Sequence, residues 1–303
     1  EKLYVEESVK TKLIDGKLIS SDIRLEITED VSKLKNEYNI APKLCVILIG
    51  DDPASHVYVR NKQKSAISAG MHAEDYKFSE NDNTENVIKL INKLNSDKTV
   101  NGILVQLPLP ENFDKDEIIN SIDPLKDVDG LHPHNVGLLS LGQPRFIPAT
   151  PFGISELLNR NNIEVEGSNM VIIGRSNIVG IPLANLFVQK NKNFNATVTV
   201  CHSRSKNISE YTLNADIIIA AIGQANYLHS DMVKPGAAII DVGINRISDD
   251  TKKSGFRLVG DVDFESMMGK AGAITPVPGG VGPMTIAMLL KNTYNASLLQ
   301  MKQ

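Results

Sequence analysis

Short apolar runs and amphipathic stretches alternate along the chain. Residues 44–49 and 103–107 are continuous apolar runs, a pattern typical of strands that a parallel sheet buries on both faces. Residues 15–38 carry apolar side chains at every third or fourth position, which predicts an amphipathic helix. The other elements expected here are a helix over 53–69, a strand over 72–78 and a helix over 84–94. The first half is therefore predicted to be a parallel sheet with right-handed strand–helix crossovers.

The same alternation returns after a loop-rich segment at residues 123–150, which holds four prolines and three glycines. Thr150 and Pro151 are a typical N-cap and first-turn pair, so a helix is expected to begin there. The remaining expected elements are strands over 170–173, 197–200, 216–221 and 237–242, a helix from Pro182, and a last helix from 284 to about 299. We therefore expect two α/β domains, with the last helix packed back on the first.

The composition is that of an ordinary globular protein. Its 303 residues suffice for two domains of roughly 150 residues each. Lys and Arg total 32 against 36 Asp and Glu, and this slight acidic excess gives no reason to expect a nucleic-acid partner. No apolar run approaches the roughly 20 residues of a membrane span, so no membrane partner is expected. Cys45 and Cys201 lie far apart, which predicts neither a disulfide nor a zinc site. We expect a reducing compartment, the cytoplasm, or an organelle if a leader has been removed.

A glycine turn between a strand and a helix is the first candidate site. Gly174 follows the strand expected over 170–173, and Gly180 opens the next helix, whose free N–H groups and dipole attract a pyrophosphate. The spacing of the two glycines departs from the G-x-G-x-x-G pattern, so the turn alone is also compatible with an ordinary strand end. The strand before it, the helix after it and a further strand about twenty residues on favour a dinucleotide site.

The end of that further strand distinguishes NAD from NADP. NAD sites typically place an acid there for the ribose 2′-hydroxyl, whereas residues 201–206 (Cys-His-Ser-Arg-Ser-Lys) contain none. Ser203 and Arg204, together with Arg175 in the glycine turn, suit a phosphate instead. A solvated basic loop is the alternative interpretation. The balance favours NADP.

Three side chains of the first half share one face of an expected helix. Ser55, Tyr58 and Lys62 are three and four residues apart, on the helix that Asp52 caps and Pro53 begins. A Tyr–Lys pair at this spacing is often surface packing, in which the lysine stem covers the ring. Here the helix directly follows a parallel strand, and ligands of open sheets bind near the carboxyl ends of the strands. A ligand site is therefore the second interpretation.

Further polar residues lie near the same sheet edge. Gln106 interrupts a buried run, where an unpaired amide is costly, so it either bonds to a neighbouring loop or faces a polar ligand. Asp127 and Asp129 place two carboxylates beside a glycine, a pattern compatible with metal binding or acid–base chemistry. No further acid stands at ligand spacing, and His132 and His134 would point in opposite directions in an extended chain. We therefore expect no metal.

Three glycine-bearing segments follow strands in the second half. Residues 221–224 and 241–244 each end a buried strand, where glycine lets a ligand approach the backbone. The two segments would flank a nicotinamide. Asp241 is expected to cap a neighbouring loop rather than to act in catalysis. Residues 274–285 form a rigid Pro- and Gly-rich loop whose backbone can lie very close to a flat ligand. An ordinary interdomain connector has the same composition, so both interpretations stay open.

Five motifs occur together over nearly the whole chain. They are Pro53-Ala-Ser-x-x-Tyr58-Val-x-x-Lys62, Gly102-Ile-Leu-Val-Gln106-Leu-Pro-Leu-Pro110, Lys126-Asp-Val-Asp129-Gly130, Gly174-Arg-Ser-x-x-Val-Gly180-x-Pro182 and Thr275-Pro-Val-Pro-Gly-Gly-Val-Gly-Pro-Met-Thr285. In this order they resemble the methylenetetrahydrofolate dehydrogenase/cyclohydrolase family, and the last motif is highly specific.

The resemblance implies two domains with a cleft between them. The first is an N-terminal three-layer α/β catalytic domain that binds folate (residues 1–149, completed by helix 284–303), and the second is a Rossmann-type NAD(P)-binding domain (residues 150–283). It also implies a homodimeric enzyme of one-carbon folate interconversion and purine biosynthesis. Such an enzyme oxidises methylenetetrahydrofolate to methenyltetrahydrofolate with NADP and hydrolyses the product to formyltetrahydrofolate.

The resemblance also assigns roles by position. Lys62 corresponds to the catalytic lysine, Tyr58 to the aromatic residue that packs on folate, Gln106 to the glutamine that tunes the lysine, and Asp129 to the carboxylate that binds the pterin. The implied folate contacts are Ser55, Tyr58, Asp129, Pro278, Gly279 and Gly280. The implied cofactor contacts are Gly174, Arg175, Ser176, Ser203 and Ile244.

The chemistry fits these residue types. Oxidation leaves a cationic amidinium, so the protein mainly positions the reactants. Hydrolysis then needs a base, and an unperturbed lysine, with a pKa of about 10.4, is protonated at neutral pH. A cation alongside and partial burial both lower that pKa. We hypothesise that the charge of the substrate primes Lys62 as the base and that Gln106 fixes its direction.

Two other interpretations belong to different functional classes. One is a two-domain dehydrogenase of hydroxy acids or amino acids, which needs a general base beside the nicotinamide loops. No isolated His or Lys stands there. The other is a catalytically silent nucleotide-binding protein, which the joint presence of Tyr58, Lys62, Gln106 and Asp129 disfavours. The sequence leaves open the relative strength of the two activities and the direction of flux.

Overall fold

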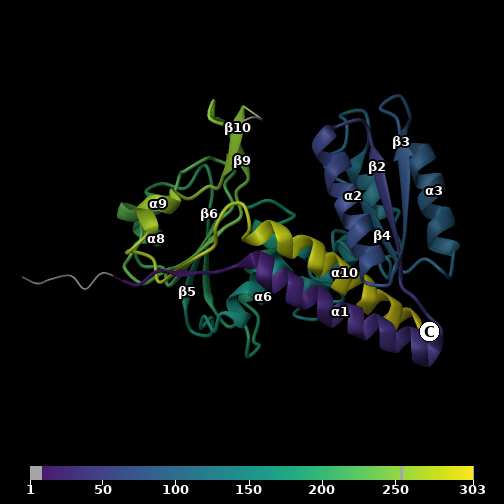
Figure 1. Cartoon of the computed structure of the whole chain (residues 1–303), viewed down its shortest axis with the longest axis horizontal. Helices are drawn as coiled ribbons and strands as arrows, with labels where there is room; N and C mark the ends of the chain where they lie inside the picture. Colours follow the sequence, from purple (N-terminus) through teal and green to yellow (C-terminus); the bar gives the residue numbers. More distant parts are fainter. Residues whose placement is uncertain (1–8, 253–254, 303) are drawn as a thin grey trace, which may run out of the picture. The chain divides into compact units, whose positions relative to one another are not determined.

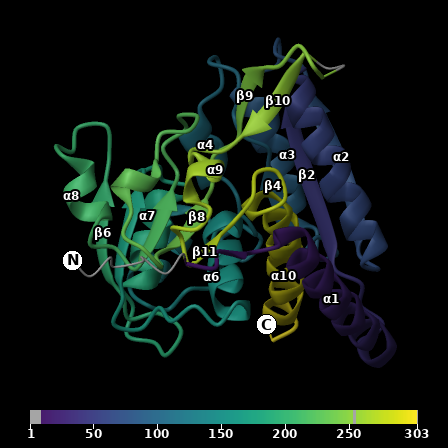
Figure 2. The same cartoon turned by 60° about the vertical axis from the view of Figure 1, so that its left-hand side comes forward.

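The computed structural model describes the chain except for residues 1–8, 253–254 and 303 (Figures 1 and 2). The first eight residues of the expected catalytic domain and the last residue of the expected final helix thus lie outside the described residues. None of the helices in the described part combines the length and the apolar character that crossing a bilayer requires.

The described residues form two compact units. The first, here called the three-stranded unit, comprises residues 20–149 and 286–302. The second, here called the six-stranded unit, comprises residues 9–19 and 150–285. Each unit is described by itself below.

The three-stranded unit is a parallel sheet of order β3-β2-β4 with helices on both faces. Its strands are β2 (Lys43–Ile49), β3 (His72–Phe78) and β4 (Gly102–Val105). Its helices are α2 (Pro53–Ser68), α3 (Thr84–Ser96), α4 (Lys115–Asn120), α5 (Pro133–Ser140) and most of α1 (Gly16–Tyr38) and α10 (Val281–Gln300).

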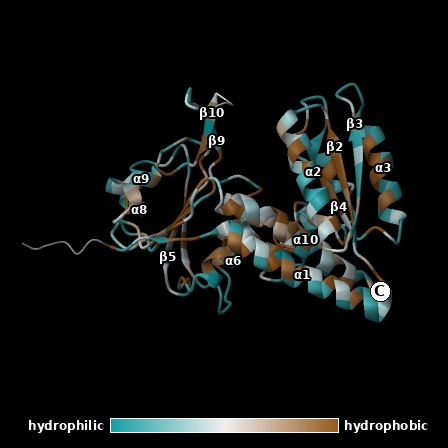
Figure 3. Cartoon of the chain, viewed as in Figure 1, coloured by the Kyte–Doolittle hydropathy of each residue, from teal (hydrophilic) through white to brown (hydrophobic). Residues whose placement is uncertain are grey.

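The central strand β2 is buried on both faces, as its apolar run predicts. One face carries Cys45, Ile47 and Ile49, which pack with the apolar side of α3 and with α4 in a single buried cluster. Helix α2 contacts β2 and β3 and lies on the other side of the sheet (Figure 1). Coloured by hydropathy, β2 is hydrophobic, whereas the edge strand β3 is mostly hydrophilic (Figure 3). Burial differs in the same way, because all but the first residue of β2 is buried, whereas β3 consists of exposed and half-buried residues.

Helices α1 and α10 run side by side in both views (Figures 1 and 2), and Lys291 of α10 forms an ion pair of 3.4 Å with Asp30 of α1. The periodic apolar residues of α1 are buried at Ile23, Ile27, Val31 and Leu34. The expectation that Tyr38 continues this face is wrong, because its side chain is exposed at the last residue of the helix.

The six-stranded unit is a parallel sheet of order β1-β11-β8-β7-β5-β6 with a separate antiparallel pair, β9 and β10. Its strands are β1 (Lys12–Leu13), β5 (Asn169–Ile173), β6 (Thr197–Cys201), β7 (Ile217–Ala220), β8 (Ala238–Asp241), β9 (Asn245–Ser248), β10 (Phe256–Val259) and β11 (Ala273–Ile274). Its helices are α6 (Ala149–Arg160), α7 (Gly180–Phe187), α8 (Ile208–Thr212), the 3₁₀ turn η1 (Ser230–Met232) and α9 (Phe264–Met267).

The strand order of this unit contains a topological switch point. In the sheet, β6 lies on one side of β5. The next strand in the chain, β7, lies on the other side of β5. The loops after β5 and β7 therefore diverge at one carboxyl edge. Open α/β sheets bind their ligands at such a point.

Several elements lie where the sequence analysis expected none. Helix α5 falls within the segment that was expected to be loop, and α4 was not expected. The short strands β1 and β11 and the pair β9 and β10 were also missed. The strand expected over 103–107 ends at Val105, so Gln106 and Leu107 follow it. Helix α6 begins at Ala149, which puts Thr150 in its first turn rather than at the N-cap.

Candidate active site

Helix α2 places three candidate side chains just beyond the carboxyl end of β2. The Asp52 carboxylate accepts a hydrogen bond from the Ser55 N–H at 2.8 Å, and Pro53 takes the first position of the helix. This cap fixes where the helix begins. Ser55 is buried, whereas the Tyr58 side chain is 46 % exposed and presents its ring for contact.

Lys62 and Gln106 form the central contact of the site. The Lys62 Nζ donates to the Gln106 Oε1 at 2.8 Å. The Gln106 Nε2 donates to the Leu107 carbonyl at 2.7 Å, which holds the amide with its oxygen toward the lysine. Gln106 thus bonds to the adjoining loop, as the first interpretation predicts, and its contact with a ligand stays a prediction.

Lys62 and Asp129 influence each other electrostatically. Burial lowers the pKa of Lys62, and the nearby Asp129 carboxylate opposes this effect. Burial raises the pKa of Asp129 to about 6, and Lys62 opposes that shift in turn. The site therefore holds an amine that loses its proton more easily than usual, beside a carboxylate that is mostly ionised at pH 7.

The two carboxylates of the 127–129 segment differ in their partners. Asp127 is buried and accepts hydrogen bonds from the backbone N–H groups of Leu131 and His132 and from the Asn135 side chain. Within the described residues, no hydrogen bond or ion pair engages the Asp129 carboxylate. Asp127 is therefore a structural residue, and Asp129 is the carboxylate available to a ligand.

The loop that carries Asp129 is held on two sides. The buried Lys126 ammonium donates to three carbonyl oxygens at the end of α3, those of Leu94 (2.8 Å), Asn95 (2.7 Å) and Asp97 (2.7 Å). From α10, the buried Asn292 side chain donates to the Val128 carbonyl at 2.8 Å. These contacts fix the backbone on both sides of Asp129. These roles of Lys126 and Asn292 are not apparent from the sequence pattern.

The His132 ring caps a helix. Its Nδ1 accepts the His134 backbone N–H at 3.0 Å and thereby caps α5. In the part of the chain that the structure describes, no three His, Cys, Asp or Glu side chains gather as a metal site would need.

In the six-stranded unit, Gly174 and Gly180 form a tight turn at the switch point. Gly174 has a φ of +132°, and a Cβ there would overlap the Ala221 carbonyl at the end of β7. A Cβ at Gly180 would overlap the Gly174 carbonyl. Only glycine fits either position, so the chain packs closely on itself where the loops diverge.

Exposed polar side chains surround this turn. Arg175 and Ser176 are exposed within it, and the Ser176 Oγ accepts the Val179 N–H at 3.2 Å. Ser203 is exposed in the turn that follows β6, the neighbour of β5 in the sheet. The glycine turn and the Ser203 turn therefore lie at the same edge, because parallel strands end on one side.

The Pro- and Gly-rich loop packs closely on the start of α1. A Cβ at Gly16 would overlap the Gly280 carbonyl, and the Lys17 N–H donates to the Gly279 carbonyl at 3.1 Å. Gly279 and Gly280 are buried, whereas Pro278 is exposed. Ile244, after β8, is also exposed. Gly279 has a φ of +110°, and a Cβ at Gly280 would overlap the Pro276 carbonyl, so the backbone of the loop accounts for the two glycines and their contact with folate stays a prediction.

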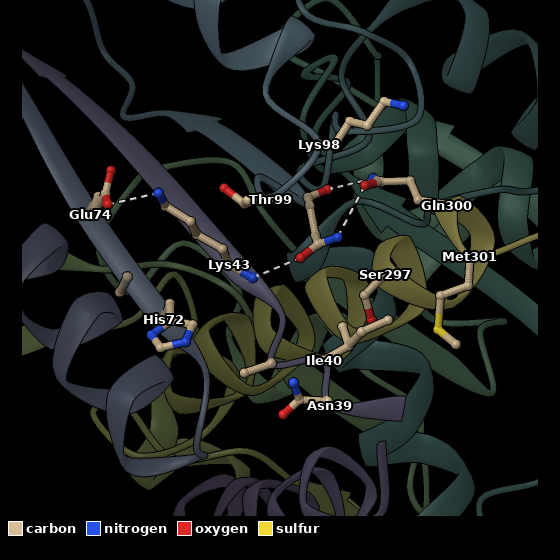
Figure 4. Close-up of a pocket in the computed structure, with 13 residues that line it drawn as sticks. Asn39, Ile40, Lys43, His72, Glu74, Lys98, Thr99, Ser297, Gln300 and Met301 are labelled. Carbon is tan, nitrogen blue, oxygen red and sulfur yellow. Dashed lines mark hydrogen bonds and ion pairs between the residues drawn. The ribbon is translucent and has the colours of Figure 1, made fainter. Parts of the chain in front are cut away.

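A separate pocket of about 680 Å³ lies at the opposite, amino-terminal end of the three-stranded sheet (Figure 4). Its polar side chains bond to one another: Lys43 pairs with Glu74 at 2.7 Å, and the buried Asn101 bonds to Gln300 at 3.1 Å. None of the predicted site residues lines it. Because these groups are already paired, the pocket is not a candidate for the chemistry above.

Two family models cover most of the chain. The catalytic-domain model of tetrahydrofolate dehydrogenase/cyclohydrolase matches residues 14–129, and the NAD(P)-binding-domain model of the same family matches residues 148–301. The first match contains Ser55, Tyr58, Lys62, Gln106 and Asp129, and the second contains the cofactor candidates and residues 278–280.

Individual relatives agree over nearly their full length. The bifunctional protein FolD of Pelodictyon phaeoclathratiforme is 55% identical over 286 residues, which cover 94% of this chain and 97% of the relative. That of Salinibacter ruber is 50% identical, covering 95% of this chain and 96% of its own.

Solved structures show the same fold. The bifunctional FolD enzyme of Campylobacter jejuni matches with a TM-score of 0.90 and 49% identity, covering 95% of this chain and 99% of its own. The Trypanosoma brucei FolD, solved with NADP cofactor and an inhibitor, matches with a TM-score of 0.91 and 37% identity, covering 97% and 99%. The chain therefore belongs to the tetrahydrofolate dehydrogenase/cyclohydrolase family.

Proposed function

We propose that Lys62, Gln106, Tyr58 and Asp129 form the folate site of a bifunctional enzyme. The chain oxidises methylenetetrahydrofolate to methenyltetrahydrofolate with NADP and hydrolyses the methenyl product to formyltetrahydrofolate. The observation that carries the site assignment is the 2.8 Å hydrogen bond from Lys62 to Gln106. This bond directs an amine whose pKa is lowered, and the Asp129 carboxylate is near the amine. Hydrolysis of a cationic substrate needs this combination.

In hydrolysis, Lys62 acts as the general base. When the amine is neutral, one N–H remains bonded to Gln106 and its lone pair points elsewhere, toward a water on the methenyl carbon. That water adds to the carbon as its proton passes to Lys62 Nζ, and the cationic charge of the folate is neutralised. One C–N bond of the adduct then breaks: its nitrogen takes a proton from the Lys62 ammonium, the hydroxyl proton of the adduct returns to the amine, and the carbon becomes the formyl group. The positive substrate also disfavours the ammonium form, so burial and substrate lower the pKa of Lys62 together.

Asp129 and Tyr58 bind the folate. An ionised Asp129 accepts two N–H groups from the aminopyrimidine edge of the pterin in charge-assisted hydrogen bonds. The half-exposed Tyr58 ring packs against the pterin face. Ser55, Pro278, Gly279 and Gly280 complete the proposed folate contacts.

The six-stranded unit supplies the dinucleotide site, and its residues fit NADP. In this proposal the pyrophosphate lies on the tight turn of Gly174 and Gly180, next to the start of α7. Arg175, Ser176 and Ser203 are exposed around it. None of the three is an acid, which would repel a 2′-phosphate. Ile244 contacts the nicotinamide half in this proposal. NADP supplies the acceptor for the hydride that leaves the methylene carbon.

One assay tests the function. Methylenetetrahydrofolate is mixed with the protein and either NADP or NAD, and absorbance is followed at the reduced-nicotinamide and methenyl bands. We expect reduction with NADP, little with NAD, and decay of the methenyl band as hydrolysis proceeds. A hydroxy acid or amino acid that is oxidised in place of the folate would overturn the proposal.

We also propose that the chain forms a homodimer in the cytoplasm. Ile178, Ile181 and Val188 are exposed in α7 and the residues beside it, and α7 contacts β6, the outermost strand of the described sheet. An apolar stripe beside an unpaired strand edge can meet the same surface of a second copy across a twofold axis. Sedimentation of Ile181→Glu against the unaltered chain tests this surface, with a shift to monomer expected. An unaltered chain that sediments as a monomer would refute the homodimer. Cell fractionation tests the compartment.

A further inference from the structure

Two loops follow the carboxyl ends of β7 and β8, and each bonds to the sheet only through its first residue among the described backbone contacts, Ala221 to Ile173 and Val242 to Ala220. Residues 221–224 follow β7, and residues 242–244 follow β8 and lead into β9. Both lie where the proposed function puts the nicotinamide half of NADP, and Ile244 belongs to the second. Because the parallel ladder stops at the strand ends, some other contact must fix these loops.

A single buried carboxylate ties the two loops together. Asp261 is fully buried, and its Oδ2 accepts the backbone N–H groups of Ile222 at 2.7 Å and Gly223 at 2.8 Å. Its Oδ1 accepts the Asn245 side-chain amide at 2.9 Å. One oxygen thus holds the first loop, and the other holds the residue next to Ile244.

A second buried carboxylate holds Asp261 itself. The Asp241 Oδ1 accepts the Asp261 N–H at 2.9 Å and the Gly243 N–H at 2.9 Å, and its Oδ2 accepts the Val262 N–H at 3.0 Å. The expectation that Asp241 caps a neighbouring loop is therefore confirmed. A Cβ at Gly243 would overlap the Asp261 carboxylate, and one at Gly260 would overlap that of Asp241.

Burying two neighbouring carboxylates is unfavourable unless their hydrogen bonds compensate for it. Here the compensation comes mainly from backbone N–H groups of the loops themselves, through charge-assisted bonds that are shorter and stronger than neutral ones. The loops are consequently fixed before any ligand arrives. Preformed loops of this kind reduce the ordering that binding otherwise requires.

We propose that Asp261 is a positioning residue for the nicotinamide half of NADP, acting through the loops at 221–224 and 242–245 that its carboxylate joins. The inference rests on the proposed function, since it needs NADP to bind at these strand ends. Asp261 does not touch the cofactor in this proposal. It sets the backbone of Ile222 and Gly223 and the direction of Ile244.

The test exchanges the two partners of one hydrogen bond. The Asn245→Asp variant places a second carboxylate opposite that of Asp261 and removes the side-chain amide that donates to it. The double variant Asn245→Asp/Asp261→Asn restores a donor–acceptor pair with the same atoms and charge. Asp263→Asn is the matched control, because Asp263 caps α9 at the Ser266 N–H and takes no part in the two loops.

The readouts separate the cofactor site from the fold. Calorimetric titration gives the Kd for NADP, steady-state kinetics give its KM, and hydrolysis of supplied methenyltetrahydrofolate proceeds without NADP. We expect Asn245→Asp to raise the Kd and KM for NADP about tenfold or more, with hydrolysis within about twofold of the unaltered chain. The double variant should return to within about threefold, and the control should bind NADP unchanged.

Three results would overturn the proposal: an unchanged Kd in Asn245→Asp, an equal loss of hydrolysis, or a double variant no better than the single one. Failure of the proposed function shows differently, because the unaltered chain would then neither bind NADP nor oxidise methylenetetrahydrofolate. The unaltered chain is therefore measured first.

Discussion

The Lys62 ammonium and the Gln106 amide meet at 2.8 Å, and the amide is kept in orientation by its own bond to the Leu107 carbonyl. The lysine comes from α2 and the glutamine from the end of β4, so two neighbouring strand ends build the contact. Gln106 accepts from Lys62 without carrying charge, so it directs the amine and does not stabilise its protonated form as a carboxylate would. This distinction underlies the first two predictions.

Replacing Lys62 by Met should separate the two activities. The general base is lost, so hydrolysis of methenyltetrahydrofolate should fall by about 10²–10⁴-fold. Some oxidation of methylenetetrahydrofolate should survive, because that step needs positioning and not a base. Stopped-flow absorbance at the methenyl band measures both. Lys64→Met, at an exposed lysine on the same helix, is the control and should keep both activities. Undiminished hydrolysis in Lys62→Met would remove the lysine from its role.

Replacing Gln106 by Glu should move the pH profile of hydrolysis. A carboxylate at this position favours the ammonium form and raises the pKa of Lys62, whereas burial alone lowers it. Hydrolysis needs the neutral amine, so the rising limb of kcat/KM should shift by about 1–3 pH units to higher pH. The rate at neutral pH should fall and should recover in alkaline buffer. A lower rate with an unmoved limb would argue against this coupling.

Replacing Asp129 by Asn should weaken folate binding and stabilise the fold at pH 7. The folded pKa of Asp129 is about 6, above the value of about 3.9 for an unfolded Asp, so the ionised carboxyl opposes folding above that range. The stability of the unaltered chain should fall as pH rises from about 4 to 6. The variant has no ionisable group at this position. Its free energy of unfolding should therefore exceed that of the unaltered chain by about 1–2 kcal/mol at pH 7 and by little at pH 4.

Chemical denaturation at the two pH values measures the stability of Asp129→Asn, and titration with a folate analogue measures its affinity. We expect the affinity to drop about tenfold or more, because two charge-assisted hydrogen bonds lose their charge. Asp127→Asn should instead destabilise the fold, since that carboxylate is bonded to the chain itself. Tight folate binding by Asp129→Asn would exclude Asp129 from the site.

Replacing Asn101 by Ala should loosen the end of α10. Its side chain accepts the Lys43 N–H at 2.9 Å and donates to Gln300, and Figure 4 shows Lys43 and Gln300 in the same pocket. The loss leaves buried groups without partners and should cost about 1–3 kcal/mol in the free energy of unfolding. Lys98→Ala, at an exposed residue of the same pocket, should change little. Equal stability of the two variants would show that this anchor is unimportant.

Replacing Ser203 by Asp should reduce the preference for NADP. A carboxylate after β6 repels the 2′-phosphate and accepts the ribose hydroxyls of NAD. The KM for NADP should rise about tenfold or more, with that for NAD unchanged or lower. Thr197→Asp adds the same charge at the other end of β6 and is the control. An equal rise in the KM for NADP and in the KM for NAD would place the 2′-phosphate elsewhere.

Local sequence signals predicted the parts of the fold that local physics determines. The buried run of β2, the Asp52 cap with Pro53, and the placement of Tyr58 and Lys62 on one helix face follow from neighbouring residues. Helix α5 was missed because its cap is the His132 ring, an unusual acceptor for that purpose. Helix α4 carries a more ordinary signal, Asp114 three residues before Glu117, which the sequence analysis did not use.

Contacts between distant residues could not be read from the sequence in the same way. Asp261 lies 39 residues from Ile222, and nothing near it in the chain marks it as a loop anchor except the preceding Gly260. The strands β1 and β11 are only two residues long and exist because each pairs with a segment far along the chain. Topology creates these features, so their signals are absent from any local window.

Lys126 uses all three of its ammonium protons on carbonyls at the end of α3. Its reactivity toward acylating reagents should consequently be suppressed for as long as the folded state persists, while the exposed lysines react freely. The rate at which Lys126 is acylated therefore reports how often the region around Asp129 opens. Mass spectrometry of the labelled chain measures this rate.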